Sequence, residues 1–379
     1  MKSDTKNCSN LLKRPELKNL GTFTSVYRNG IHKNLIDFCN INYADRERYQ
    51  KLTESENIVS TFLFNIFANS NGGCILTSGS TEAIFLALYL AKTKGTAKGI
   101  IHPNIVLGKN AHMSWTRTAE ILDLKIKIVN STKKGLDYVK LEELVDRNTC
   151  LVVGTMMTTE LGSIDNFQFL NNICKKKDVQ LHIDAAIGGF IVPFHKSSIK
   201  YTFKELSNLQ SLNVSGHKYG LSTPGAGALL IRNQIDKAKL SKRISYLSSG
   251  EQHLDRFLLT MNSLGIISWA AYIQKFQREG YANNVSDYLK VKMILCKNLT
   301  QMGFDIYCGS KLSPYIFLSH RHITDISKNL QDRGWIQSTY ESSEINKQGI
   351  RIVIKKGQEE ILTTQLLKDI SEITNSLQN

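Results

Sequence analysis

Short apolar runs alternate with longer helical patterns between residues 74 and 232, and this alternation constrains the fold more than any other feature of the sequence. Strands that alternate with helices favour a mostly parallel sheet with helices on both faces. We therefore predict an α/β fold in which ligands bind beyond the carboxyl ends of the strands. The predicted strands span residues 74–77, 105–107, 125–129, 151–154, 179–184, 209–214 and 226–232.

The regions on either side of this stretch predict the domain organisation. Residues 1–55 are polar and broken, which predicts an N-terminal arm suited to wrapping a partner subunit. We expect residues 56–250 to form the large domain, with a mobile loop over Ser245–Gly250 at its end. A long helical pattern at residues 264–299 precedes a β-α-β-α tail. Residues 251–379 are therefore predicted to form a linker helix and a small C-terminal α+β domain.

A hydroxyl-rich turn follows the first predicted strand. Residues 77–83 read TSGSTEA and lead into an apolar helical pattern. The free N–H groups at a helix N-terminus, together with the hydroxyls of Ser80 and Thr81, are suited to holding a phosphate. The same residues also match a capping box, in which a Ser or Thr and a later Glu only close the end of the helix. The turn alone does not decide between these two interpretations.

A carboxylate and an amine follow two later strands. Asp184 ends the strand in HIDAAIGGF, where a buried carboxylate needs a partner such as a protonated pyridine nitrogen, or else caps a turn. Lys218 follows the strand in VSGHKYG, where an amine can form a Schiff base, although most lysines are solvated surface charges. His112, in AHMSW, is either an ordinary histidine or one that lies on a cofactor ring and transfers protons. Together with the phosphate turn, these residues predict a pyridoxal phosphate enzyme.

Five motifs in order carry a family resemblance. TSGSTEA, AHMSW, TTELGSID, HIDAAIGGFIVPF and VSGHKYG resemble the group II pyridoxal phosphate-dependent amino-acid decarboxylases, strongly over residues 72–232. The third and fourth motifs are most similar to the archaeal-type tyrosine/aspartate decarboxylases, and VSGHK is closer to the bacterial histidine decarboxylases. The resemblance implies the fold type I architecture of pyridoxal phosphate-dependent transferases. It also implies a homodimer with the active site at the subunit interface.

The resemblance implies roles around the cofactor ring. Lys218 would bind pyridoxal 5'-phosphate covalently, and Asp184 would pair with its pyridine nitrogen. Ala186 would contact one face of the ring and His112 the other. Thr158, the first residue of TTELGSID, would line the edge of the ring.

The resemblance also implies contacts at the phosphate and at the substrate. Ser80, Thr81, Ser215 and His217 would hold the phosphate. Arg351, in GIRIVI, would bind the substrate carboxylate. Departures from the family pattern occur at residues 42–51, 156–157, 255–265 and 355–357, and they bear on the substrate more than on the cofactor.

The expected reaction is the α-decarboxylation of an L-amino acid to an amine and carbon dioxide. A carbon–carbon lyase of the sphingosine-phosphate lyase type is the alternative enzyme. A non-catalytic partner that retains the fold is a second alternative. An absorption spectrum of the bound cofactor separates this last class from the two enzymes.

The composition of the chain limits the kinds of partner and the cellular compartment that we expect. The net charge of +15 is spread over isolated lysines and short runs without a nucleic-acid-binding motif, so we expect no nucleic-acid partner and an attraction for anionic ligands. No apolar run approaches the roughly 18 residues of a membrane span, and the polar residues 1–18 lack the apolar core of a secretory signal. Seven cysteines lie scattered without a CxxC pair, which suggests neither a disulfide framework nor a metal site. We predict a cytoplasmic enzyme whose partner is a small-molecule amino-acid substrate.

Overall fold

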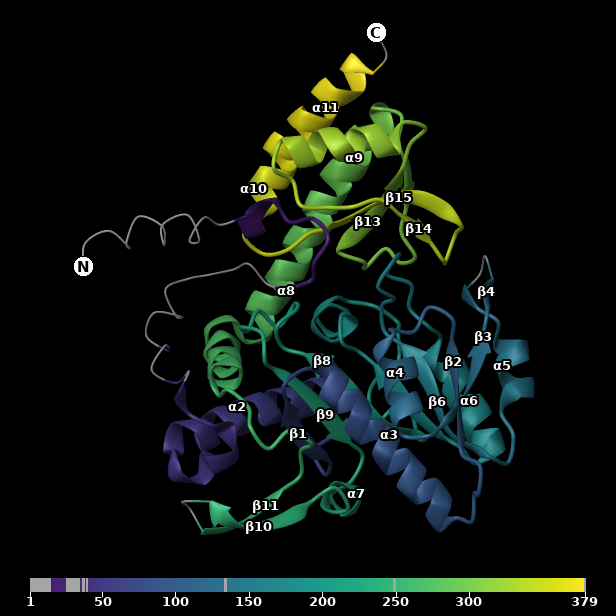
Figure 1. Ribbon diagram of the computed structural model, residues 1–379, viewed down its shortest axis with the longest axis vertical. Helices are drawn as coiled ribbons and strands as arrows, with labels where there is room; N and C mark the ends of the chain where they lie inside the picture. The colour runs from purple at the N-terminus through teal and green to yellow at the C-terminus, as the bar shows by residue number, and fades with distance from the viewer. Residues whose placement is uncertain are drawn as a thin grey trace.

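A seven-stranded sheet forms the centre of the larger part of the molecule (Figure 1). This computed structural model describes residues 15–24, 35, 38, 40–132, 135–247 and 250–377. The order of the strands in the sheet is β1-β9-β8-β7-β6-β2-β3. Their bounds are β1 (Gly73–Thr77), β2 (Asn104–Gly108), β3 (Lys125–Val129), β6 (Thr149–Thr155), β7 (Gln180–Asp184), β8 (Leu209–Ser215) and β9 (Gly227–Ile231).

Most neighbours in this sheet are parallel. Strands β3, β2, β6, β7 and β8 pair in parallel, and β9 is antiparallel to both β8 and β1. Strand β1 consequently runs in the same direction as β8. Every residue of β8 and β9 is buried, as expected for strands covered on both faces. The mostly parallel sheet confirms the predicted α/β fold.

Helices cover both faces of the sheet. Ile105 and Leu107 of β2 share a core cluster with Ile84 of α3, whereas Val106 belongs to the core cluster that contains Leu170 of α6. Successive side chains of a strand point to opposite faces, so α3 and α6 lie on opposite sides of the sheet. The helices of this part are α2 (Gln50–Phe67), α3 (Ser80–Ala97), α4 (Ser114–Ile121), α5 (Tyr138–Leu144), α6 (Phe167–Lys177) and α7 (Gln234–Ala238).

A four-stranded antiparallel sheet, in the order β12-β13-β15-β14, forms a second and smaller unit (Figure 1). The long helix α8 connects it to the larger part and contains one residue with non-helical dihedral angles, Gln277. The elements are α8 (Leu264–Gln301), β12 (Asp305–Tyr307), β13 (Tyr315–Ser319), α9 (Ile323–Asp332), β14 (Tyr340–Ser342), β15 (Lys347–Val353), α10 (Glu359–Ile361) and α11 (Leu367–Ser376).

The N-terminal segment 15–24 packs against this smaller sheet of its own chain. The amide of Leu20 donates to the carbonyl of Ile336 at 3.0 Å, and the amide of Val353 donates to the carbonyl of Leu20 at 2.9 Å. The ammonium of Lys355 donates to the carbonyl of Asn19 at 3.0 Å. This part of the predicted arm is therefore held within the chain. Much of the rest falls on residues 1–14 and 25–34, outside the described residues.

A β-hairpin occupies most of the segment predicted as a mobile loop. Strand β10 (Lys242–Leu247) pairs antiparallel with β11 (Gly250–Leu254), so the loop prediction is wrong for Ser245 to Leu247 and for Gly250. Ser248 and Ser249 lie outside the described residues. The mixture of polar and apolar residues in this segment concealed its strand character. Among the described residues, no helix is both long enough and apolar enough to span a membrane.

Candidate active site

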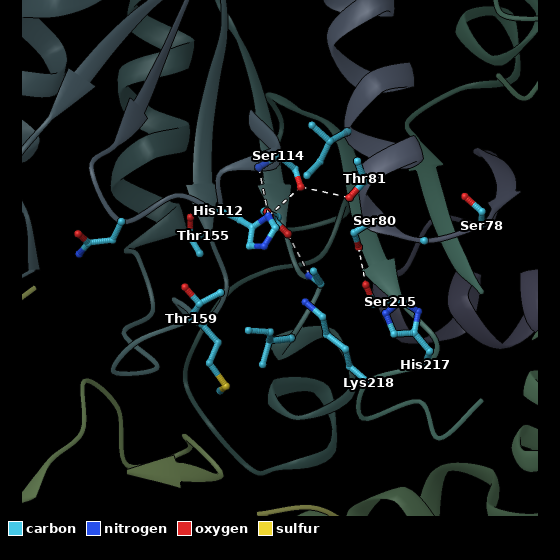
Figure 2. Close-up of a pocket in the computed structure, with 17 residues that line it drawn as sticks. Ser78, Ser80, Thr81, His112, Ser114, Thr155, Thr159, Ser215, His217 and Lys218 are labelled. Atoms are coloured by element: carbon cyan, nitrogen blue, oxygen red, sulfur yellow. Dashed lines mark hydrogen bonds between the residues drawn. The ribbon is translucent and has the colours of Figure 1, made fainter. Parts of the chain in front are cut away.

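A cavity of about 430 Å³ opens beyond the carboxyl ends of β1, β6, β7 and β8 (Figure 2). It brings together residues that are far apart in the sequence, as parallel strands allow. All predicted site residues line it except Thr158 and Arg351. Those that do are Ser80, Thr81, His112, Asp184, Ala186, Ser215, His217 and Lys218.

The hydroxyl-rich turn joins two elements at one end of the cavity. Ser80 begins α3, and its Oγ shares a hydrogen bond of 2.8 Å with the Oγ of Ser215 at the end of β8. Glu82 closes the turn by accepting from the amide of Ser78 at 2.7 Å. The capping interpretation and the phosphate interpretation are therefore compatible. Glu82 caps the turn, while the hydroxyls of Ser80 and Thr81 remain on the cavity wall.

Three donors converge on the carboxylate of Asp184. The indole Nε1 of Trp115 donates to Oδ2 at 2.8 Å. The Nδ2 of Asn213 and the amide of Ala186 each donate to Oδ1 at 3.0 Å. A carboxylate offers about four lone-pair sites, so one acceptor site remains for a donor in the cavity. The sequence did not single out Trp115 or Asn213, because a Trp at a helix start and an Asn inside an apolar run have no distinctive pattern.

A buried histidine, His182, holds Asn213 in the orientation that donates to Asp184. His182 is fully buried, with Nε2 at 2.7 Å from Oδ1 of Asn213 and Nδ1 at 2.7 Å from Oγ of Ser211. Since the amide nitrogen of Asn213 faces a carboxylate, its oxygen faces His182 and accepts the proton of Nε2. Burial lowers the pKa of His182 to about 4, and the hydrogen bond with Asn213 opposes this. His182 is therefore neutral and structural.

His112 lines the cavity beside Ser114 (Figure 2). Its Nδ1 accepts from the amide of Ser114 at 3.2 Å and lies 2.8 Å from the Oγ of Ser114. That hydroxyl in turn lies 3.1 Å from the Oγ1 of Thr81. Because Nδ1 is an acceptor, the neutral ring carries its proton on Nε2. Burial lowers the pKa of His112, and Lys218 lowers it further.

Lys218 directs its amine into the cavity from the residues that follow β8 (Figure 2). Burial lowers the pKa of this ammonium to about 8, and Asp184 opposes the shift. The amine is thus partly neutral near physiological pH, which suits a nucleophile. Gly216 is required before it, because a Cβ there would lie 2.6 Å from Cδ2 of Trp269.

Thr158 and Arg351 are placed differently from the expectation. The hydroxyl of Thr158 is buried and donates to Glu344 at 2.7 Å, while Thr159 lines the cavity instead. The guanidinium of Arg351 donates to the carbonyls of Thr159 and Gly21. It lines a second cavity of about 530 Å³, to which Thr159 also contributes.

Phe23 lies between Arg351 and Lys218. The guanidinium carbon of Arg351 is 4.6 Å from the centre of the Phe23 ring, and Nζ of Lys218 is 5.7 Å from the same centre. The N-terminal segment thus reaches the neighbourhood of the cavity. Nothing in the local sequence of residues 20–24 indicated this position, which depends on tertiary packing.

The cavity has the groups that pyridoxal phosphate requires. Hydroxyls and a helix N-terminus suit the phosphate, the free acceptor site of Asp184 suits a protonated ring nitrogen, and the amine of Lys218 suits the aldehyde. A match to the family described as "Pyridoxal-dependent decarboxylase conserved domain" spans residues 15–308. The chain belongs to this family. It is an amino-acid decarboxylase that uses pyridoxal phosphate.

Individual relatives agree with the family assignment. The decarboxylase is 30% identical to a glutamate decarboxylase of Solanum lycopersicum, over 95% of this chain and 77% of the tomato protein. It is 28% identical to a probable L-tyrosine/L-aspartate decarboxylase of Methanothermobacter thermautotrophicus, over 80% of this chain and 83% of that protein.

Solved structures confirm the fold type I architecture of this decarboxylase. The glutamate decarboxylase of Lactobacillus brevis superposes with a TM-score of 0.89 at 26% identity, over 99% of this chain and 91% of that one. A sphingosine-1-phosphate lyase of Burkholderia pseudomallei has a TM-score of 0.83 at 17% identity, over 98% and 89% of the two chains. The second likeness concerns the fold alone, so the lyase remains only the alternative.

Proposed function

We propose that this decarboxylase acts on an acidic amino acid and that L-glutamate is its preferred substrate. The observation that carries the proposal is the similarity to glutamate decarboxylases along nearly the whole chain, in sequence and in structure. The charge of the molecule supports it, since Lys218, Arg351 and the buried Lys355 lie near the cavities and the net charge is +15. A cationic site attracts a substrate with two carboxylates.

We assign the cofactor contacts as follows. Ser80, Thr81, Ser215 and His217 hold the phosphate, and Lys218 holds the aldehyde carbon. Asp184 keeps the ring nitrogen protonated, and a charge-assisted hydrogen bond of this kind contributes roughly 1.5–3 kcal/mol. Ala186 and His112 contact the two faces of the ring.

The chain itself orients the substrate and moves protons. When bound, pyridoxal phosphate supplies the ring that accepts the electron pair of the carbon–carbon bond that breaks as carbon dioxide leaves. Lys218 has an amine that is easily protonated and deprotonated, and His112 presents an N–H at Nε2. Either group is suited to protonating the α-carbon after carbon dioxide has left. Walls formed by Ile84, Met157 and Ile187 restrict water around this carbon.

Carbon dioxide release from a panel of L-amino acids tests the substrate. With cofactor supplied, we expect kcat/KM for glutamate to exceed that for aspartate by about 10- to 200-fold, the range for one methylene group. Tyrosine and histidine should react more slowly still. A preference for aspartate, tyrosine or histidine would refute the proposed substrate while leaving the reaction type intact.

We also propose that Arg351 orients a substrate carboxylate. Its guanidinium and the amine of Lys218 lie over the same Phe23 ring, and its buried Nε has no hydrogen-bond partner among the described residues, so one donor of Arg351 remains available. Arg351→Lys should lower kcat/KM by roughly 10- to 100-fold and leave the absorption of bound cofactor unchanged, because a point charge cannot copy the planar fork.

Arg333→Lys is a matched control for this variant. Arg333 also lies in the smaller unit, where it bonds Asp369 and Glu372 at the surface. It should retain full activity. If Arg351→Lys matches the wild type, Arg351 does not anchor the substrate.

We infer a cytoplasmic homodimer in which the partner subunit completes the active site. Buried thiols at Cys74, Cys150 and Cys174 suit a reducing compartment. Exposed Phe257, Leu258 and Leu259 form a short apolar stretch whose first two amides are held by Glu82 of the phosphate turn. An apolar surface next to the cavity supports an interface there. Sedimentation velocity measures the state, and a monomer at micromolar concentration would contradict the dimer.

A further inference from the structure

The turn from Thr158 to Ser163 separates the two cavities and is held mainly by the smaller unit. Met157 and Thr159 line the cofactor cavity, while Thr159 and Glu160 line the cavity beside Arg351. Met157 has a φ of 87°, a left-handed value that is rare for a long side chain. Such a backbone conformation costs free energy and persists only when its surroundings fix it.

Glu344, which follows β14, satisfies three donors of this turn at once. Its Oε1 accepts from the hydroxyl of Thr158 at 2.7 Å and from the amide of Leu161 at 3.2 Å. Its Oε2 accepts from the hydroxyl of Ser163 at 2.9 Å. Burial raises the pKa of Glu344, and the hydrogen bonds of Thr158 and Ser163 oppose the shift. The carboxylate belongs to the smaller unit but bonds to residues of the turn in the larger one.

The contact is reciprocal. Glu160 of the turn extends toward the smaller unit, where its carboxylate accepts from Ser342 at 2.6 Å, from Ser343 at 3.0 Å and from the amide of Glu344 at 3.3 Å. The hydroxyl of Tyr315 donates to the carbonyl of Thr158. The turn is therefore fixed from several directions by groups outside its own domain.

We propose that Glu344 is a positioning residue for the decarboxylation, because it sets the turn that presents Met157 and Thr159 to the cofactor cavity and the carbonyl of Thr159 to Arg351. Glu344 does not line the cofactor cavity, so it acts through the turn. The inference rests on the decarboxylase activity and not on the identity of the amino acid. It assigns the smaller unit a role in shaping the cavity wall.

Removal of the carboxylate should relax the turn. In Glu344→Ala the two hydroxyls and the amide of Leu161 lose their acceptor, in the turn that directly follows Met157 with its positive φ. A displacement of about 1 Å at reacting groups can lower a rate by about 100-fold. We expect kcat/KM to fall by roughly 10- to 100-fold, mainly in kcat, and the absorption band of bound cofactor to shift.

Glu344→Gln should restore most of the activity. The amide oxygen can still accept from Thr158 and Leu161, and the hydroxyl of Ser163 can reverse and accept from the amide nitrogen. We expect its kcat/KM to lie within about fivefold of the wild type, and well above that of the alanine variant. Glu341→Ala, an exposed residue of β14, is the control and should leave kcat, KM and the spectrum unchanged.

A double-mutant cycle distinguishes an effect of Glu344 through the turn from a general loss of stability. Thr158→Val keeps the shape of the side chain but removes the donor that Glu344 accepts. If Glu344 acts through the turn, the losses of Glu344→Ala and Thr158→Val should be less than additive in kcat. Melting temperatures and cofactor spectra of all variants are recorded beside the kinetics.

The outcomes are distinct. An active wild type, a slow alanine variant, recovery in the glutamine variant and a coupled cycle would support the inference. Glu344→Ala within twofold of wild type would overturn it. So would equal losses in alanine and glutamine variants that follow their melting temperatures, since these indicate stability alone. A wild type that releases no carbon dioxide would instead count against the reaction itself.

Discussion

Replacing Lys218 with alanine is expected to abolish the visible absorption of bound cofactor and to lower kcat by roughly 10³-fold or more. The residue is expected to hold the cofactor and to serve in proton transfer, and removal of a group with such roles typically costs several orders of magnitude. The melting temperature should change little, because the amine of Lys218 faces the cavity and is not packed in the hydrophobic core. Absorption spectra and carbon dioxide release measure the effect.

The lowered pKa gives this prediction a pH dependence. Since the pKa of Lys218 is lowered to about 8, the neutral amine becomes more abundant as the pH rises from 7 to 9. Cofactor capture by the protein without cofactor should therefore accelerate over this interval. An unperturbed lysine, with a pKa near 10.4, would change over a higher interval.

Lys355 provides a matched control. Burial also lowers its pKa to about 8, yet its amine bonds the carbonyl of Asn19 and does not line the cofactor cavity. Lys355→Ala should keep the visible absorption. After borohydride reduction and peptide mapping, the wild type should carry its label on Lys218. A label on another lysine, or an unchanged spectrum in Lys218→Ala, would refute the assignment.

Much of the fold follows from local patterns. Strand β9 was recognisable because all its residues are buried and its sequence, GALLI, is apolar throughout. The hairpin β10–β11 was missed because its exposed positions carry polar and charged residues such as Lys242 and Arg243. Helix α2 begins at Gln50, within the segment predicted as a polar arm, since its first turns are polar.

The candidate site also contains some residues that the sequence predicts and others that it does not. Side chains at the ends of parallel strands were predictable, because the topology gathers strand ends at one edge of the sheet. Contacts between segments distant in the chain were not. Thr158 turns toward Glu344, and Arg351 bonds the carbonyls of Thr159 and Gly21, because of packing between the larger and smaller parts. No spacing in the sequence encodes those pairings.

The Asp184→Asn variant should retain its fold and lose about 100-fold or more in kcat. Three donors meet the native carboxylate: Trp115 Nε1, Asn213 Nδ2 and the amide of Ala186. An amide group has a single acceptor oxygen, so its nitrogen must face at least one of these donors or the donor of the cofactor. Loss of a hydrogen bond to a charged group costs about 1.5–3 kcal/mol, which is roughly 10- to 150-fold, and loss of the charge adds to it.

The spectrum separates this role from simple burial. If Asp184 holds the ring nitrogen protonated, the variant should bind cofactor more weakly and its absorption should respond differently to pH, even where the protein is fully folded. Asp236→Asn is the control. Asp236 is also buried, but it bonds Lys94 and Lys239 at 2.7 and 2.9 Å and does not line the cofactor cavity. Its replacement should lower the melting temperature without changing the spectrum or kcat. Normal turnover with a wild-type spectrum in Asp184→Asn would show that the network of Trp115 and Asn213 serves stability alone.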